Sequence, residues 1–149
     1  MAPDTAEQAI SSFQVCKEIQ IEAAIAAAFA AMLEQLGPGN STPQGPMPMK
    51  LEAWPGGRWF RDLGNNAGHL WGHVQVIKPP TLLEVTGPLF MSYPAVSHLQ
   101  CRLVEQGRTT RLTLTHRAMG QITPEHREGV GKGWEYMLAG MKNRALSKQ

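Results

Sequence analysis

The chain has 149 residues, of which 42% are hydrophobic, and its 14 basic and 12 acidic side chains leave a formal net charge of +2. This length predicts one domain with a substantial core. The near balance of charge, without a run of like charges, argues against a nucleic-acid-binding surface. The most apolar stretch, Ala23–Leu33, is too short to span a bilayer, so membrane insertion is not expected either.

The N-terminal segment and the two cysteines both favour a cytoplasmic protein. Met1–Glu7 carries acidic rather than basic residues and no apolar stretch follows, which is unlike a secretory signal peptide. Cys16 and Cys101 are the only cysteines, a usage typical of free thiols in a reducing compartment. We expect residues 1–12 to form a flexible tail and residues 13–149 to form a single domain.

The first third of the chain predicts a strand, a helix and an irregular segment. Phe13–Ile21 alternates apolar and polar residues, as a half-buried strand does. Ala23–Leu36 is rich in alanine with an apolar stripe, and Gly37 ends the helix that it predicts. Gly37–Met49 contains four prolines, a density that predicts no regular element.

Six further segments have the pattern of strands separated by short turns. They are Lys50–Trp54, Arg58–Leu63, His69–Lys78, Thr81–Gly87, Ala95–Glu105 and Arg108–Ala118. Strands joined by short turns pair antiparallel, so the chain predicts one antiparallel sheet of about seven strands. The segment between Gly87 and Pro94 is ambiguous and is compatible with a bulge.

Thr123–Leu146 predicts one long helix that crosses the domain. Thr123 is suited to cap it, Pro124 to begin it, and apolar residues recur at steps of three and four. At 1.5 Å per residue this helix would be roughly 35 Å long. We therefore expect an α+β fold in which a curved sheet wraps around the C-terminal helix.

Four glycines lie within this helical pattern, although each costs about 1 kcal/mol relative to alanine. They are Gly129, Gly131, Gly133 and Gly140. One explanation is close packing against the sheet or a kink, and the other is space beneath the helix for a ligand.

Four short motifs follow one another along the chain: Pro55-Gly56-Gly57-Arg58-Trp59, the strand–turn–strand segment Gln75–Leu82, Gly107 with Thr110–His116, and Gly133-Trp134 with Leu138. In this order they resemble the activator of Hsp90 ATPase homologue family of the START/Bet v 1-like (SRPBCC) superfamily. The resemblance implies the helix-grip fold, with an apolar cavity between the sheet and the long helix. It also implies a lipid-, sterol- or polyketide-like ligand.

The chain departs from this family in one segment. Gly37–Met49 replaces the short second helix that the family usually has, and we expect it to form a wider or more mobile pocket mouth.

Strand alternation and the helix stripe predict which side chains line this cavity. They are Phe29, Trp59, Arg61, Leu63, Leu99, Cys101, Leu103, Leu112, Leu114, His116, Trp134, Leu138 and Met141. Such a lining is mostly apolar, as in many ligand pockets. The alternative is that these side chains fill the interior completely. Arg61 is either an inward guanidinium that needs an anionic partner or a residue at the rim.

His116 is the residue that would carry any catalysis, as general acid or base in a cyclase- or hydrolase-like reaction. The sequence offers no carboxylate spaced to orient it, so ligand binding without catalysis is favoured. His69 and His73 are four residues apart on a strand, roughly 13 Å, and cannot share one metal ion. We expect no metal and no cofactor.

The expected partner is a hydrophobic small molecule, bound by a monomer or homodimer. A third function, interaction with a chaperone ATPase, follows from the family's name. It is disfavoured because the chain offers no second domain for such contacts.

Overall fold

The computed structural model describes residues 9–147, and the structural statements below refer to these residues. The elements in chain order are β1 (Ser11–Ile21), α1 (Ile25–Leu36), β2 (Ser41–Thr42), β3 (Gly45–Pro46), β4 (Lys50–Leu51), β5 (Arg58–Gly64), β6 (Ala67–Lys78), β7 (Leu82–Gly87), β8 (Ala95–Gln106), β9 (Thr109–Gly120) and α2 (Pro124–Ser147).

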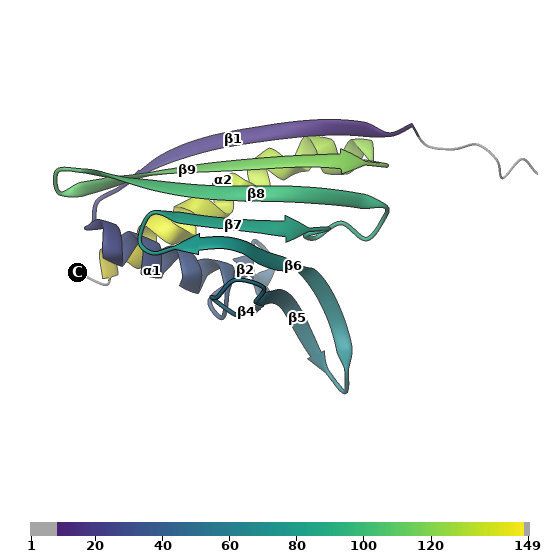
Figure 1. Cartoon of the computed structure of the whole chain (residues 1–149), viewed down its shortest axis with the longest axis horizontal. Coiled ribbons are helices and arrows are strands. Elements are labelled where there is room, and N and C mark those ends of the chain that lie inside the picture. The colour runs from purple at the N-terminus through teal and green to yellow at the C-terminus, as the bar shows by residue number, and fades with distance from the viewer. Residues whose placement is uncertain (1–8, 148–149) are drawn as a thin grey trace, which may run out of the picture.

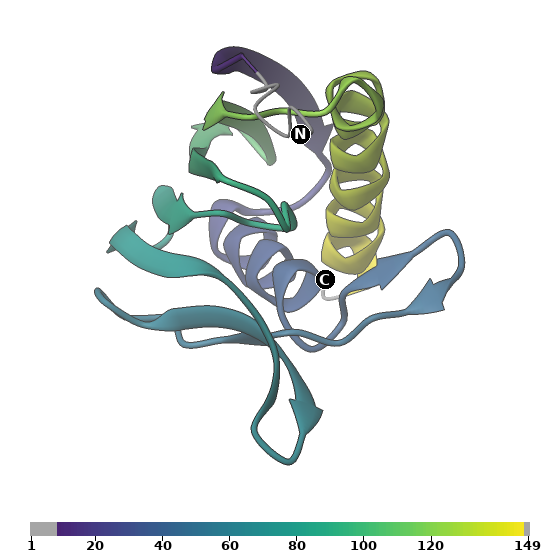
Figure 2. The same cartoon turned by 90° about the vertical axis from the view of Figure 1, so that its right-hand side faces the viewer.

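One antiparallel sheet contains seven strands in the order β1-β9-β8-β7-β6-β5-β4, and β2 and β3 form a separate small hairpin (Figure 1). The sheet curves around the side on which α1 and α2 lie, as the end-on view shows (Figure 2). The predicted α+β helix-grip fold is therefore confirmed. The long strands follow one another through short turns because only antiparallel neighbours can be joined so directly.

The register of β8 and β9 sets the inner face of the sheet. Leu99 lies opposite His116, and Cys101 lies opposite Leu114. All four side chains are buried. Because side chains alternate along a strand, the residues next to Leu99 and His116, such as His98 and Arg117, lie on the outer face.

The helix α2 begins as the sequence predicts. The Thr123 hydroxyl accepts a hydrogen bond from the His126 backbone N–H at 3.3 Å, which satisfies one of the free amides of the first turn. Its apolar stripe faces the sheet, and the buried members are Val130, Trp134, Leu138, Met141 and Ala145.

The boundaries differ from the predictions at several elements. The first strand begins at Ser11, so residues 11–12 belong to the sheet, while residues 1–8 of the predicted tail lie outside the described residues. The segment predicted to be irregular contains the β2–β3 hairpin. β4 ends at Leu51 rather than Trp54, because the Gly57 N–H donates to the Trp54 carbonyl and closes a turn there.

The glycines of α2 do not share one structural role. A Cβ added at Gly129 or Gly133 would have no described atom within 4 Å, apart from the helix's own backbone and chain neighbours, and both residues are exposed. A Cβ at Gly140 would collide with the side-chain amide of Gln35. Close packing therefore explains Gly140. Neither close packing nor space beneath the helix explains Gly129 and Gly133.

Candidate functional site

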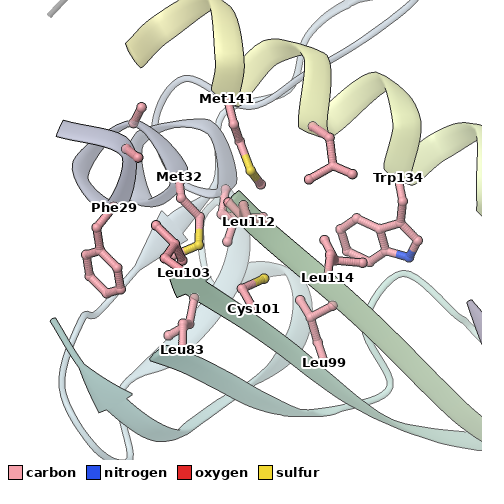
Figure 3. Close-up of a cluster of buried hydrophobic side chains, with 14 of the residues drawn as sticks. Phe29, Met32, Leu83, Leu99, Cys101, Leu103, Leu112, Leu114, Trp134 and Met141 are labelled. Carbon is pink, nitrogen blue, oxygen red and sulfur yellow. The ribbon is translucent and has the colours of Figure 1, made fainter. Parts of the chain in front are cut away.

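The interior between the sheet and α2 collects most of the side chains that the sequence predicted to line a cavity (Figure 3). Eleven of the thirteen are buried: Phe29, Trp59, Leu99, Cys101, Leu103, Leu112, Leu114, His116, Trp134, Leu138 and Met141. The ten apolar residues among them belong to one contiguous core. Strand alternation and helix periodicity thus identified the inner faces of β8, β9 and α2 correctly.

Arg61 and Leu63 do not belong to this interior. Leu63 is 53% exposed and Arg61 is half-buried, although both follow Trp59 at two-residue steps. The β5–β6 hairpin continues past the part of the sheet that the helices cover (Figure 1). Alternation predicts the face of a strand, but burial also needs a neighbouring layer, which the end of this hairpin lacks.

A chain of hydrogen bonds crosses the interior at its polar centre. The indole N–H of Trp134 donates to His116 Nδ1 at 3.0 Å, and His116 Nε2 lies 2.8 Å from Ser97 Oγ. All three residues are buried. The bonds join α2, β9 and β8, so they fix the helix over the sheet.

The same bonds determine the protonation of His116. An indole N–H can only donate, so Nδ1 carries no proton, and a neutral imidazole then has its proton on Nε2. The Nε2–H group therefore donates to Ser97 Oγ. Burial and the nearby His126 lower the pKa of His116 to about 4. His116 is thus a neutral donor to Ser97, and it has no free basic nitrogen with which to activate the serine.

Cys101 is equally unsuited to nucleophilic chemistry. Burial raises the pKa of its thiol to about 12, so the thiolate is not formed at neutral pH. Both cysteines are free, Cys16 exposed and Cys101 buried.

Aromatic rings gather where the N-terminal half of α2 meets the β7–β8 connection. The ring of Phe90 stacks on His126, with centroids 4.8 Å apart and an interplanar angle of 20°. It also lies 5.6 Å from Trp71 and 6.0 Å from both His116 and Trp134. The Tyr93 hydroxyl lies 2.9 Å from His126 Nδ1. This connection therefore closes one end of the interior.

Sequence reasoning missed most of this cluster, because Phe90 and Tyr93 lie in the segment of ambiguous pattern. Trp71 was assigned to a strand without a role. Its inward position comes from a shift in register between Trp59 and Phe60, where Trp71 is the extra residue of β6. The usable signal was the presence of two aromatic residues in the seven-residue connection between β7 and β8, since exposed loops are usually polar.

The opposite end of the interior is closed by α1 and by side chains of the C-terminal half of α2. The indole N–H of Trp59 donates to the Leu36 carbonyl at 2.8 Å, at the last turn of α1. Arg144 donates to Gln35 Oε1 at 2.7 Å and to the Gly39 carbonyl at 2.5 Å. Hydrogen bonds therefore hold α1, α2 and β5 together at this end.

Hollows also open on the surface of the described residues, and two of them are the larger. One, of about 620 Å³, is lined mainly by outward-facing residues of β1, β8 and β9, including Val96 and Met119. The other, of about 690 Å³, follows the β5–β6 hairpin and includes Arg61 and Phe60. None of the helices in residues 9–147 has the length and apolar character needed to cross a membrane.

Comparison with known proteins adds a family and a set of related folds. Residues 41–145 match the family described as "Activator of Hsp90 ATPase homolog 1-like protein". No protein of curated function matches the chain.

Three solved structures illustrate the shared fold. CalU16 from Micromonospora echinospora has a TM-score of 0.63 and 21% identity, over 93% of this chain and 85% of that one. Mll3558 from Rhizobium loti has a TM-score of 0.69 and 16% identity, and the match covers 91% of this chain and 99% of that one. DynU16, from the dynemicin biosynthetic locus, has a TM-score of 0.62 and 13% identity, and the match covers 91% of this chain and 48% of that one. At these identities the likeness shows the fold alone.

Proposed function

The chain belongs to the activator of Hsp90 ATPase homolog 1-like family, and from this premise we propose that it binds a hydrophobic small molecule between the sheet and α2. The family resemblance that the four sequence motifs indicated is confirmed by this membership. The ligand, its position and the residues that contact it belong to the proposal.

The observation that carries the proposal is the composition of the interior. The inner faces of β7, β8 and β9 and the stripe of α2 meet in one apolar region. Its central polar groups, Ser97 and His116, are already hydrogen-bonded to each other and to Trp134. A ligand there would meet apolar and aromatic surface, which favours a hydrophobic molecule.

Two further observations agree with this role. DynU16, which has the same fold, comes from a biosynthetic locus, a setting in which small molecules are handled. The protonation of His116 favours binding over an acid–base reaction at this residue, because its free nitrogen is occupied by the Trp134 donor. The free cysteines agree with the cytoplasmic location that the sequence led us to expect, and we retain it as part of the proposal.

Fluorescence titration with two hydrophobic probes tests the proposal. N-phenyl-1-naphthylamine is an aromatic probe, and cis-parinaric acid is a linear one. Leu114→Phe enlarges a fully buried side chain of β9 and should weaken binding of at least one probe by about tenfold, because the larger ring would occupy part of the region proposed for the ligand. Leu70→Phe makes the same change at an exposed position of β6 and should leave both affinities unchanged.

Native mass spectrometry of the purified protein would add the identity of any co-purified molecule. If neither probe bound the wild-type chain, the proposal would be overturned. Equal affinities of the wild type and the two leucine variants would also do so, because the probes would then bind outside the interior. A circular dichroism melt of each variant confirms that the fold is intact.

A further inference from the structure

The ring of Phe90 lies among four other aromatic side chains, which we call the aromatic cage: Trp71, His116, His126 and Trp134. His126 is nearly parallel to Phe90 at 20°, whereas Trp71 and His116 present their rings at 71° and 76°. Trp134 is tilted at 60°. One stacked face and steeply inclined neighbours form a slot that suits a flat ring.

The backbone around Phe90 is held in place by its buried neighbours and by a hydrogen bond to β6. Leu89 and Met91 are buried on either side, and the Leu89 N–H donates to the Trp71 carbonyl at 2.7 Å. Leu89 also has a φ of 55°, which is unfavourable for a residue with a Cβ. Such strain persists only where the surroundings impose it, and it occurs often at functional sites.

The Phe90 ring itself is only partly buried at the end of the interior. It can therefore leave the aromatic cage by rotation about its own side-chain bonds, while Leu89 and Met91 keep the backbone in place. The vacated slot would connect the solvent with His116 and Trp134, which line the interior where ligand binding is proposed.

We propose, building on the function proposed above, that Phe90 occupies part of the ligand site itself. The ligand that replaces it carries a planar aromatic ring. A flat ring can take over the stacking on His126 and the contacts with the inclined rings of Trp71 and His116. An alkyl chain fills the same volume but cannot reproduce these ring–ring geometries. The slot thus selects aromatic ligands over linear aliphatic ones.

This arrangement has a measurable consequence for affinity. A ligand that binds only when Phe90 has turned outward has its apparent affinity reduced by the fraction of molecules in that state. If that fraction is about one tenth, removal of the ring should raise the affinity about tenfold. A bulkier ring at position 90 should have the opposite effect.

The test compares Phe90→Ala and Phe90→Trp with the matched control Phe60→Ala. Phe60 is also half-buried, but it lies on β5 beneath Arg58 and Lys50, away from the aromatic cage. We expect Phe90→Ala to bind N-phenyl-1-naphthylamine about tenfold more tightly than the wild type, with a much smaller gain for cis-parinaric acid. Phe90→Trp should bind the aromatic probe more weakly, and Phe60→Ala should bind it as the wild type does.

The outcomes separate this inference from the function on which it rests. If the wild type binds in a manner sensitive to Leu114→Phe, yet Phe90→Ala binds no better, the function stands and the role of Phe90 is refuted. An equal gain for both probes would refute the aromatic ligand class. If neither probe binds any variant, the proposed function itself fails.

A measurement on the wild-type chain covers the case in which Phe90→Ala does not fold. Nuclear Overhauser contacts between the Phe90 and His126 rings should disappear when the protein is saturated with N-phenyl-1-naphthylamine. Contacts at the Trp59 indole N–H, at the other end of the interior, should persist. Retention of the Phe90–His126 contacts in the saturated complex would overturn the inference.

Discussion

The two halves of α2 are held to the rest of the protein in different ways. The C-terminal half lies beside α1, where Arg144 donates to Gln35 and to the Gly39 carbonyl, and Gly140 permits the close approach of Gln35. The N-terminal half carries Gly129 and Gly133 at exposed positions with nothing packed against them. It is held by the rings of Trp134 and His126, by the buried Trp134–His116 hydrogen bond, and by exposed polar contacts of Arg127 and Glu135 with β1.

This difference indicates where the fold can open. Hydrogen bonds that join buried or half-buried groups are costly to break, since each partner would be left unpaired. The N-terminal half also has such bonds, from Trp134 to His116 and between Tyr93 and His126, but it combines them with glycines, which weaken a helix, and with ring contacts that tolerate rotation. If the chain binds a ligand as proposed, entry at the Phe90 end should be easier than entry at the α1 end.

The largest effect is expected from Trp134, which fixes the N-terminal half of α2 to the sheet. Trp134→Ala removes a buried indole and leaves His116 Nδ1 without its donor. The free energy of unfolding should fall by about 3–5 kcal/mol in urea denaturation. Tyr136→Ala, which alters an exposed side chain two residues away, should cost about 1 kcal/mol or less. Similar losses in the two variants would show that Trp134 is not the main attachment.

The pH dependence of stability should report on His116. Its pKa is lowered from 6.5 to about 4 in the folded protein, first by burial and then by the charge of His126. Between these two pH values the unfolded chain binds a proton at this residue and the folded chain does not. Stability should therefore fall as the pH is lowered through this window, by about 3 kcal/mol in total.

The control for this prediction is His116→Gln, which cannot titrate. Urea denaturation at a series of pH values from 7 to 4 should give a clearly shallower dependence in the variant. Some dependence should remain, because burial also lowers the pKa of His126. If both proteins lose stability in parallel over this range, His116 does not titrate as described.

Arg144 tests the attachment of the C-terminal half. Arg144→Met keeps an apolar side chain but removes the donors to Gln35 and Gly39. We expect a loss of about 1–2 kcal/mol in thermal or urea unfolding, with no change in affinity for N-phenyl-1-naphthylamine. Arg108→Met, at an exposed turn residue, should be nearly neutral. A strong effect of Arg144→Met on probe affinity would show that the two halves of α2 act as one unit.

The sequence predicted the layers of this fold better than it predicted the aromatic cluster that closes one end of the interior. Periods of two and of three to four residues identified the inner faces of β8, β9 and α2, because burial against a second layer imposes those periods. These periods failed at Leu63, because the strand continues there beyond the second layer. They gave no information at Phe90, which lies in a connection without a periodic pattern. Which ring nitrogen of His116 carries the proton depends on a donor 18 positions away in the sequence, and no local pattern could reveal it.

The smallest effects are expected from the glycines, and they compare the halves of α2 most directly. Gly133→Ala should stabilise the protein by about 1 kcal/mol, because the added methyl group meets no described atom and alanine favours the helix. Gly140→Ala should instead destabilise it, because the Gln35 amide must move and its hydrogen bond with Arg144 is disturbed.

Hydrogen exchange of the backbone amides in the first turns of α2 should be slower in Gly133→Ala than in the wild type. The probe should also associate more slowly if opening of this half of the helix admits the ligand. An unchanged association rate in a more protected helix would mean that Phe90 leaves the cage without any movement of α2.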